Sequence, residues 1–212
     1  MKNLVKTAIL SAALAALMLP ARAQSTDDTK ATKPVDVKAV PAAKKPATID
    51  QRKENQQQRI GEGVENGSLT AGEAARLEKK EAGLNKEERK MKSDGDFTAA
   101  ERTKVQHQQN KLSRRIYHQK HDAQVRPEPR TEIGARKQAQ QQRIGEGIEN
   151  GSLTPGEAAR LEKKEVKLNQ ETRAMRAENG GRLTPADKAK VHHQQNHLSR
   201  QIHHQKHDGQ HR

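Results

Sequence analysis

The segment from Glu65 to Glu81, E-N-G-S-L-T-A-G-E-A-A-R-L-E-K-K-E, decides the fold of this chain, because it returns almost unchanged from Glu149 to Glu165. Each copy places a glycine, an apolar residue and a threonine directly before a run rich in Ala, Leu, Glu and Lys. Glycine readily adopts the left-handed conformation that ends a helix, and threonine is a favoured N-cap. The segment therefore predicts a helix end, a short turn and a new helix, twice in one chain.

The repeated unit is longer than this segment. Glu54 to Glu81 and Gln138 to Glu165 differ at four positions, and Thr98 to Asp122 resembles Thr184 to Asp208. Such self-similarity is typical of duplicated structural units. Because the copies are so alike, identity between them is poor evidence that a given residue is functionally constrained.

The same turn pattern occurs four times, twice in each copy. The glycines expected to end helices are Gly67, Gly95, Gly151 and Gly181. The threonines expected to cap the following helices are Thr70, Thr98, Thr154 and Thr184. The acids expected to complete a capping box are Glu73, Glu101, Glu157 and Asp187. Prolines 155 and 185 fall at the first helical position, where proline is best tolerated.

These signals predict three helices in each copy, at about 50–65, 71–92 and 99–121 in the first copy and at their counterparts in the second. Apolar residues recur at helical spacing, which predicts narrow seams between antiparallel neighbours. The seam residues are Leu77, Leu84, Met91, Val105, Leu112 and Ile116, with Leu161, Leu168, Met175, Val191, Leu198 and Ile202 in the second copy. The predicted fold is all-α: two tandem three-helix antiparallel repeats.

The flanking segments complete the predicted organisation. Residues 1–23 have the features of a secretory signal peptide: Lys2 and Lys6, an apolar stretch, and the small-residue site Ala21-Arg22-Ala23. Residues 24–48 are rich in Lys, Ala and Pro and are expected to be a disordered arm. A proline-containing linker, 124–131, is expected to separate repeat 1 (49–123) from repeat 2 (132–212). We expect the mature chain to be periplasmic or secreted.

The composition narrows the classes of function. The chain has no cysteine, which excludes a lipid-attachment cysteine, a disulfide and a thiolate metal site. Only 30% of it is hydrophobic and 1% aromatic, while 32% is charged, so a large core that buries an active site is not expected. No glycine-rich phosphate loop or nucleophile-base pair is recognisable. We therefore expect a binding protein and not an enzyme.

The histidines are the most unusual feature, because all ten lie in the two predicted third helices, seven of them in repeat 2. At 100° per residue, several fall on one side of the last helix, opposite Val191, Leu198 and Ile202. The candidate metal ligands are His193, His197, His203, His204, His207 and His211, with His118 and His121 in repeat 1. Imidazoles one turn apart bind copper, nickel or zinc, with oxygens from Asp122 or Asp208 as additional ligands. A solvated, pH-responsive histidine face is the alternative.

The charge of the chain and one turn motif suggest ligands other than transition metals. The excess of 41 Lys and Arg over 27 Asp and Glu suggests envelope polyanions or unfolded acidic proteins as partners. Nucleic acid is unlikely, since almost no aromatic side chain is present to stack on bases. Calcium is a third alternative, because Gly95, Phe97 and Glu101 match three positions of an EF-hand loop, although most of the other ligand positions of that loop lack oxygen-bearing side chains.

The pattern R-I-G-E-G-x-E-N-G-S-L-T-x-G-E, followed by L-T-P-A and L-S-R-x-I-x-x-Q-K-H-D, resembles a group of small exported bacterial helical-repeat proteins with L-T-P-x-E turns. That resemblance covers nearly all of both repeats and implies export and helices, but no activity. The chain is more loosely similar to the Spy and CpxP periplasmic stress chaperones, and to degenerate EF-hands. The chaperone resemblance implies ATP-independent protection of unfolded proteins.

Overall fold

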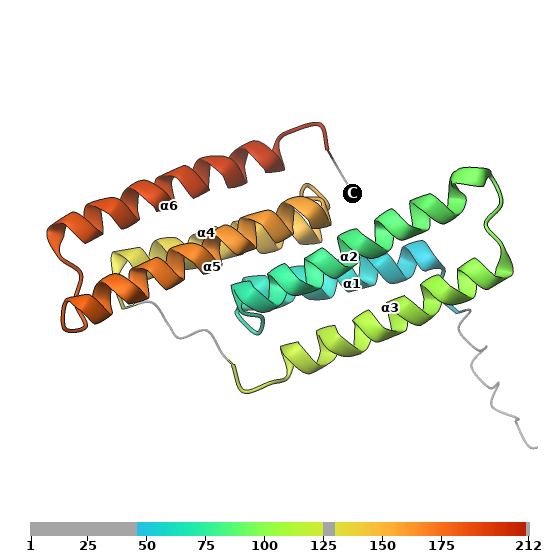
Figure 1. Cartoon of the computed structure of the whole chain (residues 1–212), viewed down its shortest axis with the longest axis horizontal. Helices are drawn as coiled ribbons and strands as arrows, with labels where there is room; N and C mark the ends of the chain where they lie inside the picture. Colours follow the sequence, from blue (N-terminus) through green and yellow to red (C-terminus); the bar gives the residue numbers. More distant parts are fainter. Residues whose placement is uncertain (1–45, 125–129, 211–212) are drawn as a thin grey trace, which may run out of the picture. The chain divides into compact units, whose positions relative to one another are not determined.

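A computed structural model of the chain describes residues 46–124 and 130–210, which form six α-helices and one short 3-10 helix (Figure 1). Repeat 1 contains α1 (Ile49–Asn66), α2 (Ala71–Met91), η1 (Lys92–Asp94) and α3 (Ala99–Lys120). Repeat 2 contains α4 (Glu132–Glu149), α5 (Pro155–Glu178) and α6 (Pro185–Lys206). No strand occurs in these two described ranges, so the all-α prediction is confirmed. The predicted signal peptide, most of the arm, the linker core 125–129 and His211 lie outside them.

The predicted turns and caps are confirmed in detail. Thr70, Thr98, Thr154 and Thr184 each accept a hydrogen bond from the third residue of the next helix, and the acid at that position bonds back to the threonine N–H. Gly67 and Gly151 adopt left-handed conformations, with φ of 80° and 79°. The chain then folds back, so that the Leu69 N–H donates to the Gly63 carbonyl over 2.8 Å. Local sequence alone therefore places every turn within a repeat.

In each repeat the third helix is attached to the first by matched polar contacts. The Gln56 amide donates to the Gln109 carbonyl and to the Ser113 hydroxyl, both over 2.7 Å. Gln140 makes the equivalent pair of bonds in repeat 2. At the other end of the third helix, Lys120 forms an ion pair with Glu62 in repeat 1, and Lys206 forms the equivalent ion pair with Glu146 in repeat 2. The same sequence thus builds the same three-helix arrangement twice.

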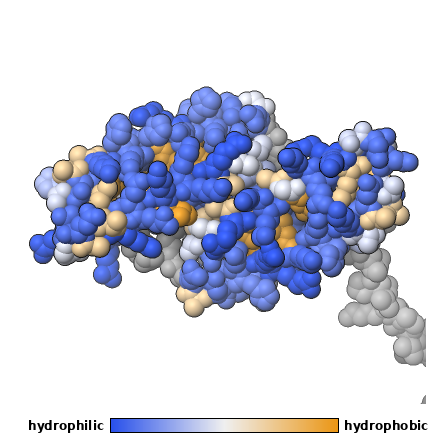
Figure 2. Space-filling view, in the orientation of Figure 1, coloured by the Kyte–Doolittle hydropathy of each residue, from blue (hydrophilic) through white to orange (hydrophobic). Residues whose placement is uncertain are grey.

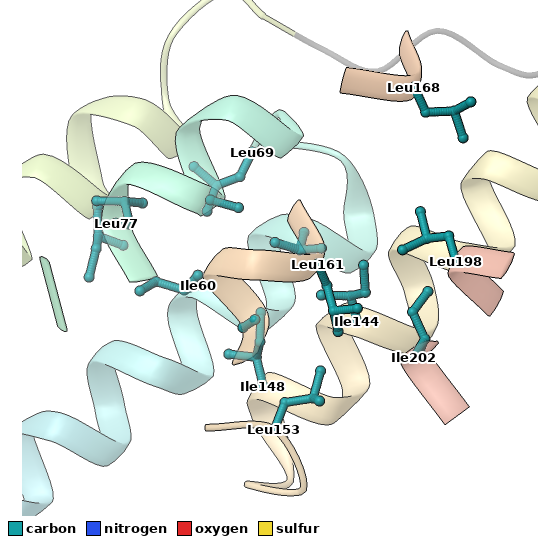
Figure 3. Packing of buried hydrophobic residues seen from close by; sticks show 14 of the residues in the cluster. Ile60, Leu69, Leu77, Ile144, Ile148, Leu153, Leu161, Leu168, Leu198 and Ile202 are labelled. Carbon is teal, nitrogen blue, oxygen red and sulfur yellow. The ribbon is translucent and has the colours of Figure 1, made fainter. Parts of the chain in front are cut away.

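The two repeats do not have separate cores. The closest helix pairs are α1 with α4 and α2 with α5, while α3 packs on α1 and α2, and α6 packs on α4 and α5. Figure 3 shows residues of both repeats, among them Ile60, Ile148 and Leu161, in one apolar cluster. Residues 45–212 form one compact unit. The sequence left open how the two predicted repeats pack against each other, and the structure joins them through one shared core, because each repeat has few apolar residues with which to cover its own inner helix faces.

Two glycines inside helices allow this close packing. A Cβ atom at Gly61 would lie 2.8 Å from the Gly145 carbonyl oxygen, and one at Gly145 would lie 2.9 Å from the Gly61 oxygen. The contacts are reciprocal, as in an isologous dimer interface, although both surfaces belong to one chain. Glycine is therefore required where α1 and α4 cross.

Candidate functional site

Helix α6 carries its histidines on the side that faces away from the core, as predicted. Val191, Leu198 and Ile202 are buried, with exposed fractions of 3% or less, whereas His193, His197, His203, His204 and His207 are exposed. The helix ends at Lys206, and His207 is its C-cap. The predicted continuation of the stripe to His211 lies outside the described residues.

His203 and His207 form a stacked imidazole pair at the end of α6. Their rings stack with centroids 4.3 Å apart and planes inclined by 22°. The Nδ1 atom of His207 lies 2.7 Å from the His203 carbonyl oxygen, so Nδ1–H donates to it and Nε2 is left as the lone-pair nitrogen. Metal-binding histidines commonly hold their second nitrogen in this way. The pair places two imidazoles one helical turn apart, and the rings must rotate out of the stack before both can bind one ion, because imidazole lone pairs lie in the ring plane.

The third helix of repeat 1 ends in the same arrangement of stacked rings, with one imidazole fewer. Tyr117 stands where repeat 2 has His203, and its ring stacks on His121 with centroids 4.2 Å apart. The Nδ1 atom of His121 lies 2.7 Å from the Tyr117 carbonyl oxygen. Stacking and capping at this helix end are therefore common to both repeats, whereas a pair of nitrogen ligands occurs only in repeat 2.

The second pair, His193 and His197, borders a groove between α5 and α6 with a volume of about 410 Å³. The groove floor is formed by Leu168 and Leu198. The Nε2 atom of His197 lies 2.8 Å from the Gln201 side-chain amide nitrogen, which donates to it. A metal ion would have to displace this hydrogen bond, whereas at His203 and His207 it would have to separate the stacked rings.

The remaining predicted ligands are not brought together. No group of three or more His, Cys, Asp or Glu side chains in the described ranges is arranged to hold one metal ion. His118 contacts Tyr117 edge-on, and His204 is exposed. Asp122 and Asp208 each accept a hydrogen bond from the backbone N–H two residues later. The arrangement therefore offers open sites with two protein ligands.

The carboxylates of the EF-hand-like turn accept hydrogen bonds from within the turn itself. The Glu101 carboxylate accepts from the Thr98 N–H and from the Thr98 hydroxyl, over 2.9 and 2.8 Å. Asp94 accepts from the Asp96 N–H. These contacts are those of a capped helix start, which explains the residues of the turn without a calcium ion.

One charged cluster was not anticipated from the sequence. Glu88 is buried, and its two carboxylate oxygens lie 2.6 Å from the ammonium groups of Lys53 and Lys92. Burial opposes ionisation of Glu88, but the hydrogen bonds from both lysines outweigh it and lower its pKa. Burial likewise opposes the charge on Lys53, and Glu88 and Asp50 raise its pKa above the ordinary value. The signal was present in the sequence as a difference between repeats, because the residue equivalent to Glu88 is Thr172.

Comparisons with known proteins assign no family. No family model, curated protein or solved structure matches the chain. No helix in the described part of the chain is long and apolar enough to cross a membrane. Function must therefore be argued from the residues themselves.

Proposed function

We propose that this chain is an exported binding protein whose last helix binds divalent transition-metal ions through paired imidazoles. The observation that carries the proposal is the His203–His207 pair, exposed, one turn apart and with Nε2 of His207 available. Because the pair lies opposite the buried side of α6, metal binding requires no rearrangement of the core. His193 and His197 provide a second pair on the same helix.

Two imidazoles leave several coordination positions to water, so the affinity should be moderate and the site should stay open to exchange. Nitrogen ligands favour copper above nickel and zinc, and calcium and magnesium should not bind. The ligand nitrogens must be unprotonated. Protons compete with the metal ion for these nitrogens, so binding should weaken as the solution is made more acidic.

The test is calorimetric titration of the mature chain with copper, nickel, zinc and calcium. Replacing His203, His207 and His211 together by Gln should remove most of the affinity and leave helix content unchanged. Replacing His118 and His121 by Gln is the matched control in repeat 1, and it should change little. Equal binding by the triple variant and the parent would defeat the proposal.

The difference between the repeats allows a gain-of-function test. The substitution Tyr117→His places an imidazole opposite His121 in the geometry that His203 has in repeat 2. It should add one further site, of an affinity similar to that of His203 and His207, at the end of α3. A folded Tyr117→His variant whose metal stoichiometry is unchanged would count against the two-imidazole site.

The chaperone alternative is favoured by a separate observation. Repeat 1 has a groove between α2 and α3 of about 370 Å³, with Leu84 and Leu112 on its floor and Lys80, Lys111 and Arg115 among its lining. The α5–α6 groove is its counterpart. Figure 2 shows hydrophobic residues emerging in narrow areas within a hydrophilic surface. Apolar floors with basic rims suit apolar segments flanked by acidic residues.

A chaperone of this kind should suppress aggregation of an unrelated denatured protein near stoichiometric amounts and without nucleotide. Protection should be strongest at low salt, where attraction to acidic clients is least screened. The substitutions Leu84→Ser and Leu168→Ser, one in each groove, should reduce protection while leaving metal binding intact. Absence of protection at low salt would exclude this second candidate.

A further inference from the structure

The most divergent polar site in the two repeats is the cleft beside the first and second helices. In repeat 2 it is a cavity of about 450 Å³ lined by the start of α4 and the middle of α5. In repeat 1 the equivalent cavity is about 420 Å³. The two cavities have similar sizes but opposite balances of charge, and this contrast indicates a ligand.

In repeat 1 the cleft contains its own anion. The Glu88 carboxylate lies between the ammonium groups of Lys53 and Lys92, at 2.6 Å from each. Lys53 also contacts Asp50 at 3.4 Å. This arrangement shows that the backbone and the neighbouring side chains of the cleft accommodate an oxyanion between two cations.

Repeat 2 keeps a basic residue at both cation positions and replaces three of the four acids in the lining. Lys137 replaces Lys53, and Arg176 replaces Lys92. The three acids Asp50, Glu54 and Glu88 correspond to Gly134, Gln138 and Thr172. The lining of the repeat 2 cleft therefore has four basic residues, Arg130, Lys137, Arg173 and Arg176, against one acid, Glu165.

The position of Glu88 is occupied in repeat 2 by Thr172, which carries no charge. The Thr172 hydroxyl is buried and donates to the Leu168 carbonyl over 2.7 Å. Among the described residues, neither Arg173 nor Arg176 forms an ion pair within 4.0 Å. Two guanidinium groups thus line a cavity in which the counterpart of an internal carboxylate is missing.

We propose that the repeat 2 cleft binds a small oxyanion of the phosphate-monoester class beside Arg173 and Arg176, whose guanidinium groups have no ion-pair partner among the described residues. The excess of positive charge matches a dianion better than a single carboxylate. The planar guanidinium of Arg176 can bind two phosphate oxygens at once. The cleft also borders the N-terminus of α4, whose dipole favours an anion, although the Gly134 N–H already donates to the Thr131 hydroxyl.

The experiment uses the mature chain without added metal and in the presence of a chelator, so that His-bound ions cannot hold the anion. Inorganic phosphate, glycerol 3-phosphate and a soluble short-chain phosphatidic acid are titrated at low ionic strength and about pH 7.5, where phosphate monoesters, whose second pKa is near 6, are dianions. All three should compete for one site, and their relative affinities distinguish free phosphate from a lipid headgroup. Nuclear magnetic resonance shifts should centre on α4 and α5.

Variants that exchange the two clefts make the test specific. Thr172→Glu restores the internal carboxylate and should weaken binding at least tenfold; Arg176→Gln should weaken it severalfold. Gln58→Glu, at an exposed position of α1, adds the same charge elsewhere and should change little. The combined change Asp50→Gly, Glu54→Gln and Glu88→Thr should raise the stoichiometry from one to two.

Circular dichroism first establishes that each variant is folded, and Arg176→Gln carries the test if Thr172→Glu is not. The proposal is overturned if Thr172→Glu or Arg176→Gln binds phosphate as tightly as Gln58→Glu does, since attraction would then arise from the basic surface as a whole. A folded triple variant with a single site would also overturn it, because the acids would not then be what distinguishes the clefts.

Discussion

The two repeats are nearly identical where they pack on each other and differ where they do not. The segment Glu54 to Glu81, which covers most of α1, the first turn and the start of α2, recurs with four changes, and it and its copy supply most of the shared core. The third helices and the cleft around Glu88 or Thr172 diverge more. Because the two repeats pack on each other through equivalent surfaces, any new side chain at Gly61 must fit against Gly145, and any new side chain at Gly145 must fit against Gly61. Residues outside that interface are free to acquire separate binding properties.

The largest expected effect comes from separating the repeats. Repeat 1 alone, residues 46–124, exposes Ile60, Val64 and Leu69, which are fully buried in the whole chain. Because its interface is self-complementary, we expect it to dimerise or to lose most of its helix content at low concentration. Light scattering and circular dichroism over a concentration series measure both outcomes. A folded monomer of either repeat would show that the cores are independent after all.

The next largest effect should follow from adding methyl groups where α1 crosses α4. Gly61→Ala and Gly145→Ala each place a Cβ within 3 Å of a carbonyl oxygen of the other helix. The helices must move apart, and overpacking of this kind costs about 1–3 kcal/mol, more than the roughly 1 kcal/mol that alanine gains in a helix. Denaturant unfolding of the single and double variants measures the cost. Unchanged stability in the double variant would contradict the close crossing.

These glycines also show what could be predicted from sequence. Helix starts, ends and buried faces followed from local chemistry, since capping boxes and left-handed glycines involve residues only a few positions apart. The shared core did not, because it depends on contacts between residues about 84 positions apart. Its one local sign was a pair of glycines inside a predicted helix, R-I-G-E-G, where glycine is otherwise unfavourable.

The candidate sites divide in the same way. Exposed imidazoles opposite Val191, Leu198 and Ile202 were predictable from helical spacing alone. The capping contact of His207 and its counterpart at His121 depend on where each helix ends, which the spacing does not give. The Glu88 cluster depends on a side chain from α1 reaching a side chain of α2. A position-by-position comparison of the repeats would have singled out this position, since Glu88 is charged and its counterpart Thr172 is not.

A smaller effect, dependent on pH, should distinguish Glu88 from Thr172. The pKa of Glu88 is lower in the folded chain than in the unfolded chain, where it is near 4.5. The ionised carboxylate therefore stabilises the fold above that pH, and this stabilisation is lost as pH falls through the lower, folded-state pKa. Glu88→Gln should therefore lower the free energy of unfolding by about 1–3 kcal/mol at pH 7 and by less at pH 3. Lys53, whose pKa is raised, adds stability that is lost only as pH rises through its folded value.

The matched change in repeat 2 is Thr172→Val, which removes a buried hydroxyl and no charge. It should cost about 1 kcal/mol or less, by the same amount at pH 7 and pH 3. Unfolding curves at both pH values test the pair. Equal pH dependence in the two variants would mean that Glu88 is not stabilised by its lysines.

The smallest expected effect is at Gly83 on the exposed side of α2, which is the only position where a substitution is expected to raise the free energy of unfolding. A Cβ there would meet nothing within 4 Å, and repeat 2 already has Lys167 at the equivalent position. Glycine costs a helix interior about 1 kcal/mol relative to alanine and somewhat less relative to lysine. Gly83→Lys should therefore raise the free energy of unfolding by about 0.5–1 kcal/mol, and Gly83→Ala should raise it slightly more. The same denaturant titration measures both, and Gly61→Ala in parallel should move the opposite way. A loss of stability at Gly83 would mean that this side of α2 is covered by something other than solvent.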